Sequence, residues 1–168
     1  MMNDQDAWDQ ATAISGTAYD SLPHDTTAEL DDLIDEIMQL KQKLVELVTC
    51  AGSSEICRNC GGECCLLGKY HVSVLDMLAY LKTGADAVIP DFSPGPACPY
   101  SGESGCLMPP GYRPVTCVIF NCQMIEDRLT AAERETLQRY ENRLRQAVAR
   151  TGRICGTRLD RPLLLSCT

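Results

Sequence analysis

Cysteine is the residue type with the most chemical potential in this chain, because eight cysteines fall between residues 57 and 122. Four of them lie in the string CRNCGGECC, and four more follow in Pro- and Gly-rich sequence. Thiolates are preferred ligands of soft metal ions, and the glycines between them let the backbone fold tightly. The pattern therefore predicts that zinc, iron or an iron–sulfur cluster is held by Cys57, Cys60, Cys64, Cys65, Cys98, Cys106, Cys117 and Cys122.

A disulfide framework and chance clustering are the alternatives for a chain with 11 cysteines. The opening MMNDQDAWDQ has neither a basic stretch nor an apolar run, so we expect no signal peptide. No segment approaches the roughly 20 apolar residues that span a bilayer, so we expect no membrane partner. These features predict a cytoplasmic protein, where thiols stay reduced, and an odd cysteine total also suits disulfides poorly. Metal ligation is the favoured interpretation.

The net charge of −8 is distributed unevenly along the chain. Residues 1–40 hold ten acids and no Lys or Arg, whereas residues 123–168 hold nine Arg against six acids. Because an acidic protein repels the phosphate backbone, we expect no nucleic-acid partner. The Arg-rich end is either a local anion site or, as we favour, a solvated face that meets the acidic helix beside the cysteine centre. The predicted partners are metal ions, with a protein partner left unidentified.

Residues 1–24 are polar and lack clear periodicity, so we expect a mobile acidic tail with Trp8 its only large anchor. Residues 25–168 then form a single cysteine-cluster metal-binding domain. Seven of the nine prolines fall in residues 84–116, where no period is visible. A loop of that length needs something to order it, and metal ligation by its cysteines would do so.

Three helices are expected, at residues 26–50, 74–83 and 130–151, because apolar residues recur there at helical spacing. The apolar run at 163–165 is expected to pack back on a mostly aliphatic core. The predicted fold is therefore mainly α: a small single domain with two long helices and one short helix around an irregular cysteine-rich centre. Each helix is expected to begin at a capping pair: Thr26 with Glu29, Ser73 with Asp76, and Thr130 with Glu133. The second helix is expected to end at Gly84 and the third at Gly152.

Common cluster signatures do not fit the cysteine spacing. The bacterial ferredoxin run needs a different third gap and a following proline, and a Rieske centre or Cys2His2 finger needs two well-placed histidines. The chain has only His24 and His71, and the first lies in the expected tail. The spacing of Cys57, Cys60 and Cys64 is also the reverse of the usual radical adenosylmethionine order.

Three separated pieces, CRNCGGECC at 57–65, CPYSGESGC at 98–106 and RPVTCVIFNC at 113–122, together resemble the YkgJ-type cysteine cluster family. That family is described as a zinc- or iron-chelating domain, and the resemblance covers residues 55–125. It implies that all eight cysteines bind metal, and it leaves the metal open. Flagellin lysine methylases carry a similar cysteine set with a four-iron cluster, but this chain shows no methyl-donor module, so methyl transfer is not implied.

Arg113 and His71 are the residues near the cysteines that could support metal binding. Arg113 could donate hydrogen bonds to thiolates around Cys117 and offset their charge, or be a surface charge beside a turn. We expect His71 to be an exposed or packed imidazole rather than a ligand, because eight thiols already suffice. No phosphate loop or hydrolase motif is present. Three cysteines lie outside the motif: Cys50, Cys155 and Cys167. We expect them to be buried as small hydrophobic residues, with a redox or disulfide-exchange role as the alternative.

The sequence thus predicts a metal-binding protein in which zinc or iron is structural or part of a scaffold. The alternative is an iron–sulfur redox protein or enzyme related to the cluster domain of flagellin lysine methylases. The sequence leaves enzymatic activity undecided. All-thiolate zinc has no open coordination position, which favours the structural role, whereas cluster iron does not carry that restriction.

Overall fold

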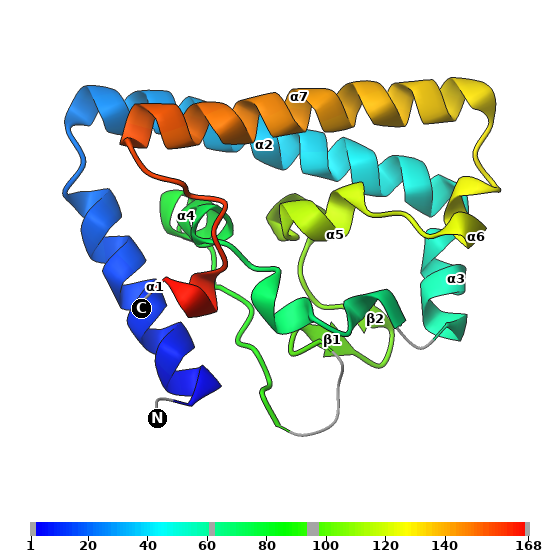
Figure 1. Cartoon of the computed structure of the whole chain (residues 1–168), viewed down its shortest axis with the longest axis horizontal. Helices are drawn as coiled ribbons and strands as arrows, with labels where there is room; N and C mark the ends of the chain where they lie inside the picture. Colours follow the sequence, from blue (N-terminus) through cyan, green and yellow to red (C-terminus); the bar gives the residue numbers. More distant parts are fainter. Residues whose placement is uncertain (1–2, 61–62, 94–97, 167–168) are drawn as a thin grey trace.

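A computed structural model describes residues 3–60, 63–93 and 98–166 and shows a mainly α-helical protein. Two long helices, α2 (His24–Cys50) and α7 (Ala131–Cys155), lie side by side and run antiparallel along one edge of the molecule (Figure 1). Below them, α1 (Asp4–Asp20) and α4 (Val74–Thr83) lie toward one end, and shorter elements occupy the other. The predicted fold class is confirmed.

The α2–α7 pair is the main packing unit of the fold. The leucine-rich face of α2 is buried, and Leu137 and Leu144 of α7 are buried with it in one hydrophobic core. Across the exposed edge, Arg143 pairs with Glu36 at 2.9 Å and Arg150 with Glu29 at 3.7 Å. The expected packing of the acidic helix on the Arg-rich helix is therefore confirmed. Because the four side chains are about half exposed, these pairs contribute little energy and mainly favour the antiparallel alignment.

Helix α4 begins and ends where the sequence predicts. Ser73 and Asp76 form a reciprocal capping box, and Gly84 ends the helix with a φ of 66° in the left-handed region that favours glycine. The Asp76 carboxylate is fully buried and also accepts a hydrogen bond from the Lys41 ammonium of α2, at 2.5 Å. A buried ion pair was not among the sequence predictions, and it fixes the start of α4 to the middle of α2.

The ends of the long helices differ in part from the predictions. The Thr130–Glu133 capping box is present, but α7 continues through Gly152 to Cys155 and ends at Gly156, which has a φ of 65°. Gly156 is therefore the C-cap, since it carries the positive φ that Gly152 lacks. Helix α2 starts at His24 after Pro23, with no side-chain cap, so the expected capping pair at Thr26 is wrong.

The expectation of a mobile tail over residues 1–24 is wrong for the described part of that segment. Helix α1 is capped by the Asn3 side chain, which accepts from the Asp6 amide at 2.8 Å. Its buried face is Ala7, Ala11 and Ser15, small residues that give no strong apolar period but let the helix pack closely. Tyr19 also donates a hydrogen bond to Asp31 of α2 at 2.6 Å. The helix therefore belongs to the folded domain.

Short elements make up the rest of the described chain, including the Pro-rich segment that was expected to lack regular structure. A two-stranded antiparallel hairpin pairs Ser101 with Cys106, and Leu163 and Leu164 pack on the core as predicted. No helix in the described ranges is long and apolar enough to cross a bilayer. The short elements are α3 (Ser53–Asn59), η1 (Glu63–Cys65), η2 (Gly68–Tyr70), β1 (Ser101–Gly102), β2 (Gly105–Cys106), η3 (Pro110–Tyr112), α5 (Val115–Ile119), α6 (Gln123–Glu126) and η4 (Leu163–Leu165).

Candidate metal centre

The eight motif cysteines come from short elements below α2, which extend from the middle of the molecule (β1, β2 and α5) to the end away from α1 (α3 and α6) (Figure 1). Helix α3 packs against both α6 and β2, which brings the first motif piece to the second and third. None of the ten described cysteines is in a disulfide, and Cys167 lies outside the described residues. The thiols lie in α3 (Cys57), at its C-cap (Cys60), in η1 (Cys64 and Cys65), before β1 (Cys98), in β2 (Cys106), in α5 (Cys117) and at the N-cap of α6 (Cys122).

Four of these thiols influence one another in every pairwise combination. The pKa of Cys65 is raised to about 12, first by burial and then by the negative charges of Cys64, Cys98 and Cys106. Burial and Cys106 raise the pKa of Cys98. The pKa of Cys117 is also raised, first by burial and then by the negative charges of Cys106, Cys98 and Cys65. Charge–charge interactions weaken with distance, so these four sulfurs lie within electrostatic range of one another, and they are here called the Cys65 set: Cys65, Cys98, Cys106 and Cys117.

The other four thiols group around Cys57. Its pKa is raised by burial first and then by Cys64, Cys60 and Cys122, while the positive charge of Arg113 acts in the opposite direction. Cys60 also lies with its thiol 3.5 Å from the carbonyl oxygen of Cys57, as expected for the C-x2-C turn. We call Cys57, Cys60, Cys64 and Cys122 the Cys57 set. The adjacent residues Cys64 and Cys65 join the two sets, because the Cys64 thiol acts on Cys57 and is also hydrogen-bonded to the thiol of Cys65.

A glycine lets the second motif piece approach the first. A Cβ at Gly68 would lie 2.7 Å from the Cβ and 3.1 Å from the Cα of Cys98, closer than van der Waals contact allows. Only a residue without a side chain fits at the first position of η2, beside this cysteine. The Gly68–Cys98 contact is therefore a steric requirement of the arrangement, and it lies outside the motif pieces that the sequence analysis used.

His71 lies at the cysteine centre, although the sequence analysis gave it no role there. Its Nδ1 is 3.3 Å from the Sγ of Cys117, and burial lowers the pKa of the imidazole, which favours the neutral form. A neutral ring can donate a hydrogen bond to a thiolate or accept one from a thiol. Because 46 residues separate the two side chains, no local spacing could reveal the contact.

Arg113 and the cysteines outside the motif have distinct environments. The Nε of Arg113 donates to the carbonyl oxygen of Met108 at 3.1 Å, which holds the side chain in the loop between β2 and α5. Its charge favours the Cys57 thiolate, as an outer-shell cation would. Cys50 is exposed, so the expectation that it is buried is wrong: it is in the last turn of α2, beyond the helix's packed face. Cys155 is partly buried.

The thiols group together without forming a closed site. Among residues 3–60, 63–93 and 98–166, no three Cys, His, Asp or Glu side chains are arranged to hold one ion. Thiolates that raise one another's pKa repel, and a soft cation would offset that repulsion, so the donor chemistry fits zinc or iron. Ligation would require the sulfurs to rotate or the short elements to draw together.

Accessibility varies within the sets. Cys57, Cys64, Cys106 and Cys117 are exposed, and the other four are partly buried. Cys117 is exposed by accessible surface although surrounding atoms desolvate its sulfur enough to raise its pKa. Solvent therefore reaches the rim of the thiol group while its interior is lined by protein.

No family model, curated protein or solved structure matches this chain. The resemblance of its three motif pieces to the YkgJ-type cysteine cluster family therefore stays a prediction.

Proposed function

We propose that this protein binds metal through its eight motif cysteines, as zinc or as iron in an iron–sulfur cluster. The observation that carries the proposal is that eight thiols from separate segments lie within electrostatic range of one another, in two overlapping groups joined through Cys64. Four sulfurs are the complement that a structural zinc ion or one iron–sulfur cluster takes from a protein. The Cys65 set and the Cys57 set would each supply one such complement.

The proposed role of the metal is to hold the short segments together. A structural zinc site contributes an apparent ~10–16 kcal/mol at neutral pH, which is large beside the ~5–15 kcal/mol net stability of a domain. The proposed setting is the cytoplasm, where thiols stay reduced and available to metal.

A redox or enzymatic iron–sulfur centre is the second candidate, favoured by the four exposed motif cysteines and by His71 beside Cys117. Electron exchange requires a partner to approach the cluster, and a partly exposed thiol group allows that. A hydrogen bond from the imidazole to a ligating sulfur would also raise the cluster's reduction potential.

Purification without oxygen, followed by a metal count and a visible spectrum, tests the proposal. Stoichiometric zinc in a colourless sample supports the structural role, and a brown sample with iron and sulfide supports the cluster. The variants Cys106→Ser and Cys60→Ser should each retain about half of the wild-type metal, since each opens one set. Cys50→Ser, outside both sets, is the matched control and should retain all of it.

Two outcomes would overturn the proposal. One is a folded wild-type protein that contains neither metal after reconstitution with zinc or with iron and sulfide. The other is a Cys50→Ser variant that loses as much metal as the motif variants. If either motif variant loses all metal while remaining folded, the eight thiols form one centre and the division into two sets is wrong.

A further inference from the structure

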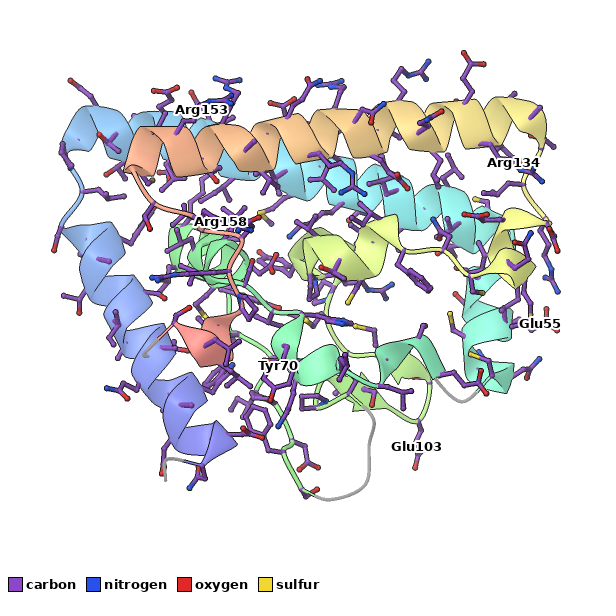
Figure 2. The ribbon with its side chains drawn as sticks, in the orientation of Figure 1. Glu55, Tyr70, Glu103, Arg134, Arg153 and Arg158 are labelled. Atoms are coloured by element: carbon purple, nitrogen blue, oxygen red, sulfur yellow. The ribbon has the colours of Figure 1, made fainter. Side chains whose placement is uncertain are left out.

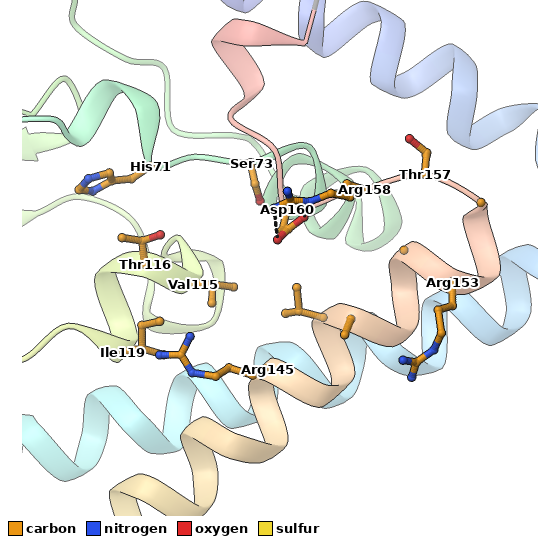
Figure 3. Close-up of a pocket in the computed structure, with 14 residues that line it drawn as sticks. His71, Ser73, Val115, Thr116, Ile119, Arg145, Arg153, Thr157, Arg158 and Asp160 are labelled. Atoms are coloured by element: carbon orange, nitrogen blue, oxygen red, sulfur yellow. Dashed lines mark hydrogen bonds and ion pairs between the residues drawn. The ribbon is translucent and has the colours of Figure 1, made fainter.

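A cavity of about 810 Å³ lies between α7, α5 and the segment that follows α7. Figure 3 shows its walls: Val115, Thr116 and Ile119 on α5, Arg145 on α7, and Arg158 with Asp160 on the returning chain. Small-molecule sites in proteins are about 300–1,000 Å³, so the cavity has the volume for a ligand. None of the proposed metal ligands lines it.

The lining combines an apolar surface with a small number of polar groups. Val115, Ile119 and Val148 supply apolar contact area, and Ser73 and Thr116 are the hydroxyl-bearing residues beside them. Apolar surface combined with polar and charged groups is typical of sites that bind organic small molecules.

The charge of the lining is positive in a protein whose net charge is −8. Arg158 is neutralised by Asp160, to which it donates two hydrogen bonds of 3.0 Å each. Arg145 forms no ion pair within the described part of the chain. It lies one helical turn from Glu141, whose pKa is raised by burial, an effect that the Arg145 charge only partly offsets. In Figure 3 the Arg145 guanidinium reaches from α7 toward Ile119 of α5. An unpaired guanidinium beside apolar side chains suits a carboxylate or phosphate group.

We propose that this cavity binds a small organic anion, with an apolar body against Val115, Ile119 and Val148 and a carboxylate or phosphate group on Arg145. Ser73 is held in the wall by its hydrogen bonds to Asp76, which is itself paired with Lys41. The wall is therefore fixed from the core side before any ligand enters.

The cavity also adjoins the thiol group. His71 and Thr116 both line it, Thr116 precedes Cys117 in the chain, and the His71 Nδ1 contacts the Cys117 sulfur. A ligand in the cavity would lie beside the Cys65 set, separated from it by one imidazole. The anion site itself does not depend on whether the thiols hold metal.

Titration calorimetry of the protein as purified tests the site with three probes that share an eight-carbon chain: octanoate, octyl phosphate and octanol. At least one of the two anions should bind at one per chain, and octanol should bind at least about tenfold more weakly, because it cannot form the charged hydrogen bond. A preference for one anion distinguishes a carboxylate from a phosphate ligand.

Arg145→Gln should weaken anion binding by about tenfold or more. Arg134→Gln is the matched control: it removes the same charge from the other end of α7 (Figure 2), where Arg134 is exposed and lines no described cavity. It should leave binding within about twofold. Ala149→Phe fills the cavity from α7 without a change of charge, and it should abolish binding.

The proposal is overturned if neither anion saturates. It is also overturned if both arginine variants weaken binding equally, because the effect would then come from net charge. Unchanged binding by Ala149→Phe would place the anion elsewhere. Arg145 and Ala149 are exposed residues of α7, so the melting temperature of each variant, followed by circular dichroism, should match that of the wild type. This measurement shows whether a loss of binding comes from a loss of folding.

Discussion

Replacing Lys41 with methionine is expected to lower the free energy of unfolding by about 3–5 kcal/mol. Lys41 is 1% exposed and Asp76 is fully buried, so methionine fills a similar volume but leaves the carboxylate without its counter-charge. The remaining donors to Asp76 are the amide and hydroxyl of Ser73, at 2.9 and 2.6 Å, and neither carries a charge. For a chain of this length the loss corresponds to a fall in melting temperature of roughly 6–20 °C.

Urea unfolding followed by circular dichroism measures this loss. Lys43→Met, at an exposed position of the same helix, is the matched control and should change stability by no more than about 1 kcal/mol, since it loses only a cation–π contact of 5.7 Å to the Tyr140 ring. The double variant Lys41→Met with Asp76→Asn should recover part of the loss, because no unpaired charge then remains buried. A Lys41→Met variant as stable as the control would show that the pair is not buried as described, and the reasoning would fail.

Three further perturbations test other parts of the structure. Gly68→Ala should push Cys98 away and reduce the metal content by about half, measured by elemental analysis, and an unchanged content would contradict the steric argument. Burial, then the hydrogen bond to Asp31, raise the pKa of Tyr19, so its contribution to stability is complete below its ordinary pKa of about 10 and is lost as the pH rises further. The stability difference between wild type and Tyr19→Phe in urea melts should therefore shrink above pH ~10, and a constant difference would refute the contact. Gly156→Ala should destabilise the end of α7 by about 1 kcal/mol in thermal melts, because its φ is 65°, and a neutral effect would argue against that cap.

Helix starts set by local chemistry could be predicted from the sequence. Ser73 with Asp76 and Thr130 with Glu133 satisfy their own backbone amides, so the information lies within four residues. The end of α7 was harder to predict, because two glycines are four residues apart and only tertiary packing decides between them. The predicted end at Gly152 was wrong for that reason.

Helix α1 was missed because its packing surface consists of small residues. Periodicity analysis detects large apolar side chains, whereas Ala7, Ala11 and Ser15 bury little area each and still allow close approach. Its attachments are also remote in sequence: Lys69 pairs with Asp4 at 2.8 Å across 65 positions. The Lys41–Asp76 pair was missed for the same reason, because its two residues are 35 positions apart in the sequence.

The identity of the candidate ligands could be predicted, but their grouping could not. Residue type and spacing single out the eight cysteines, whereas the division into two sets depends on how α3, β2 and α5 pack. Cys64 acts on both Cys57 and Cys65 and so lies between the two sets, and Cys122, from the third motif piece, acts on Cys57 of the first. Only tertiary structure carries that information.

Buried apolar residues next to the cysteines indicate that the core, rather than metal alone, positions the sulfurs. Each of four cysteine-bearing segments has an anchor in the hydrophobic core within two residues of a thiol: Ile56 beside Cys57, Tyr100 near Cys98, Met108 near Cys106 and Val118 beside Cys117. The same core includes the packed faces of α2, α4 and α7, which hold no motif cysteine. Removing metal should therefore loosen the segments between these anchors while the long helices stay folded. Hydrogen exchange after chelation should show lost protection in η1, β2 and α5 but not in α2 or α7, and global unfolding would mean that metal holds the core itself.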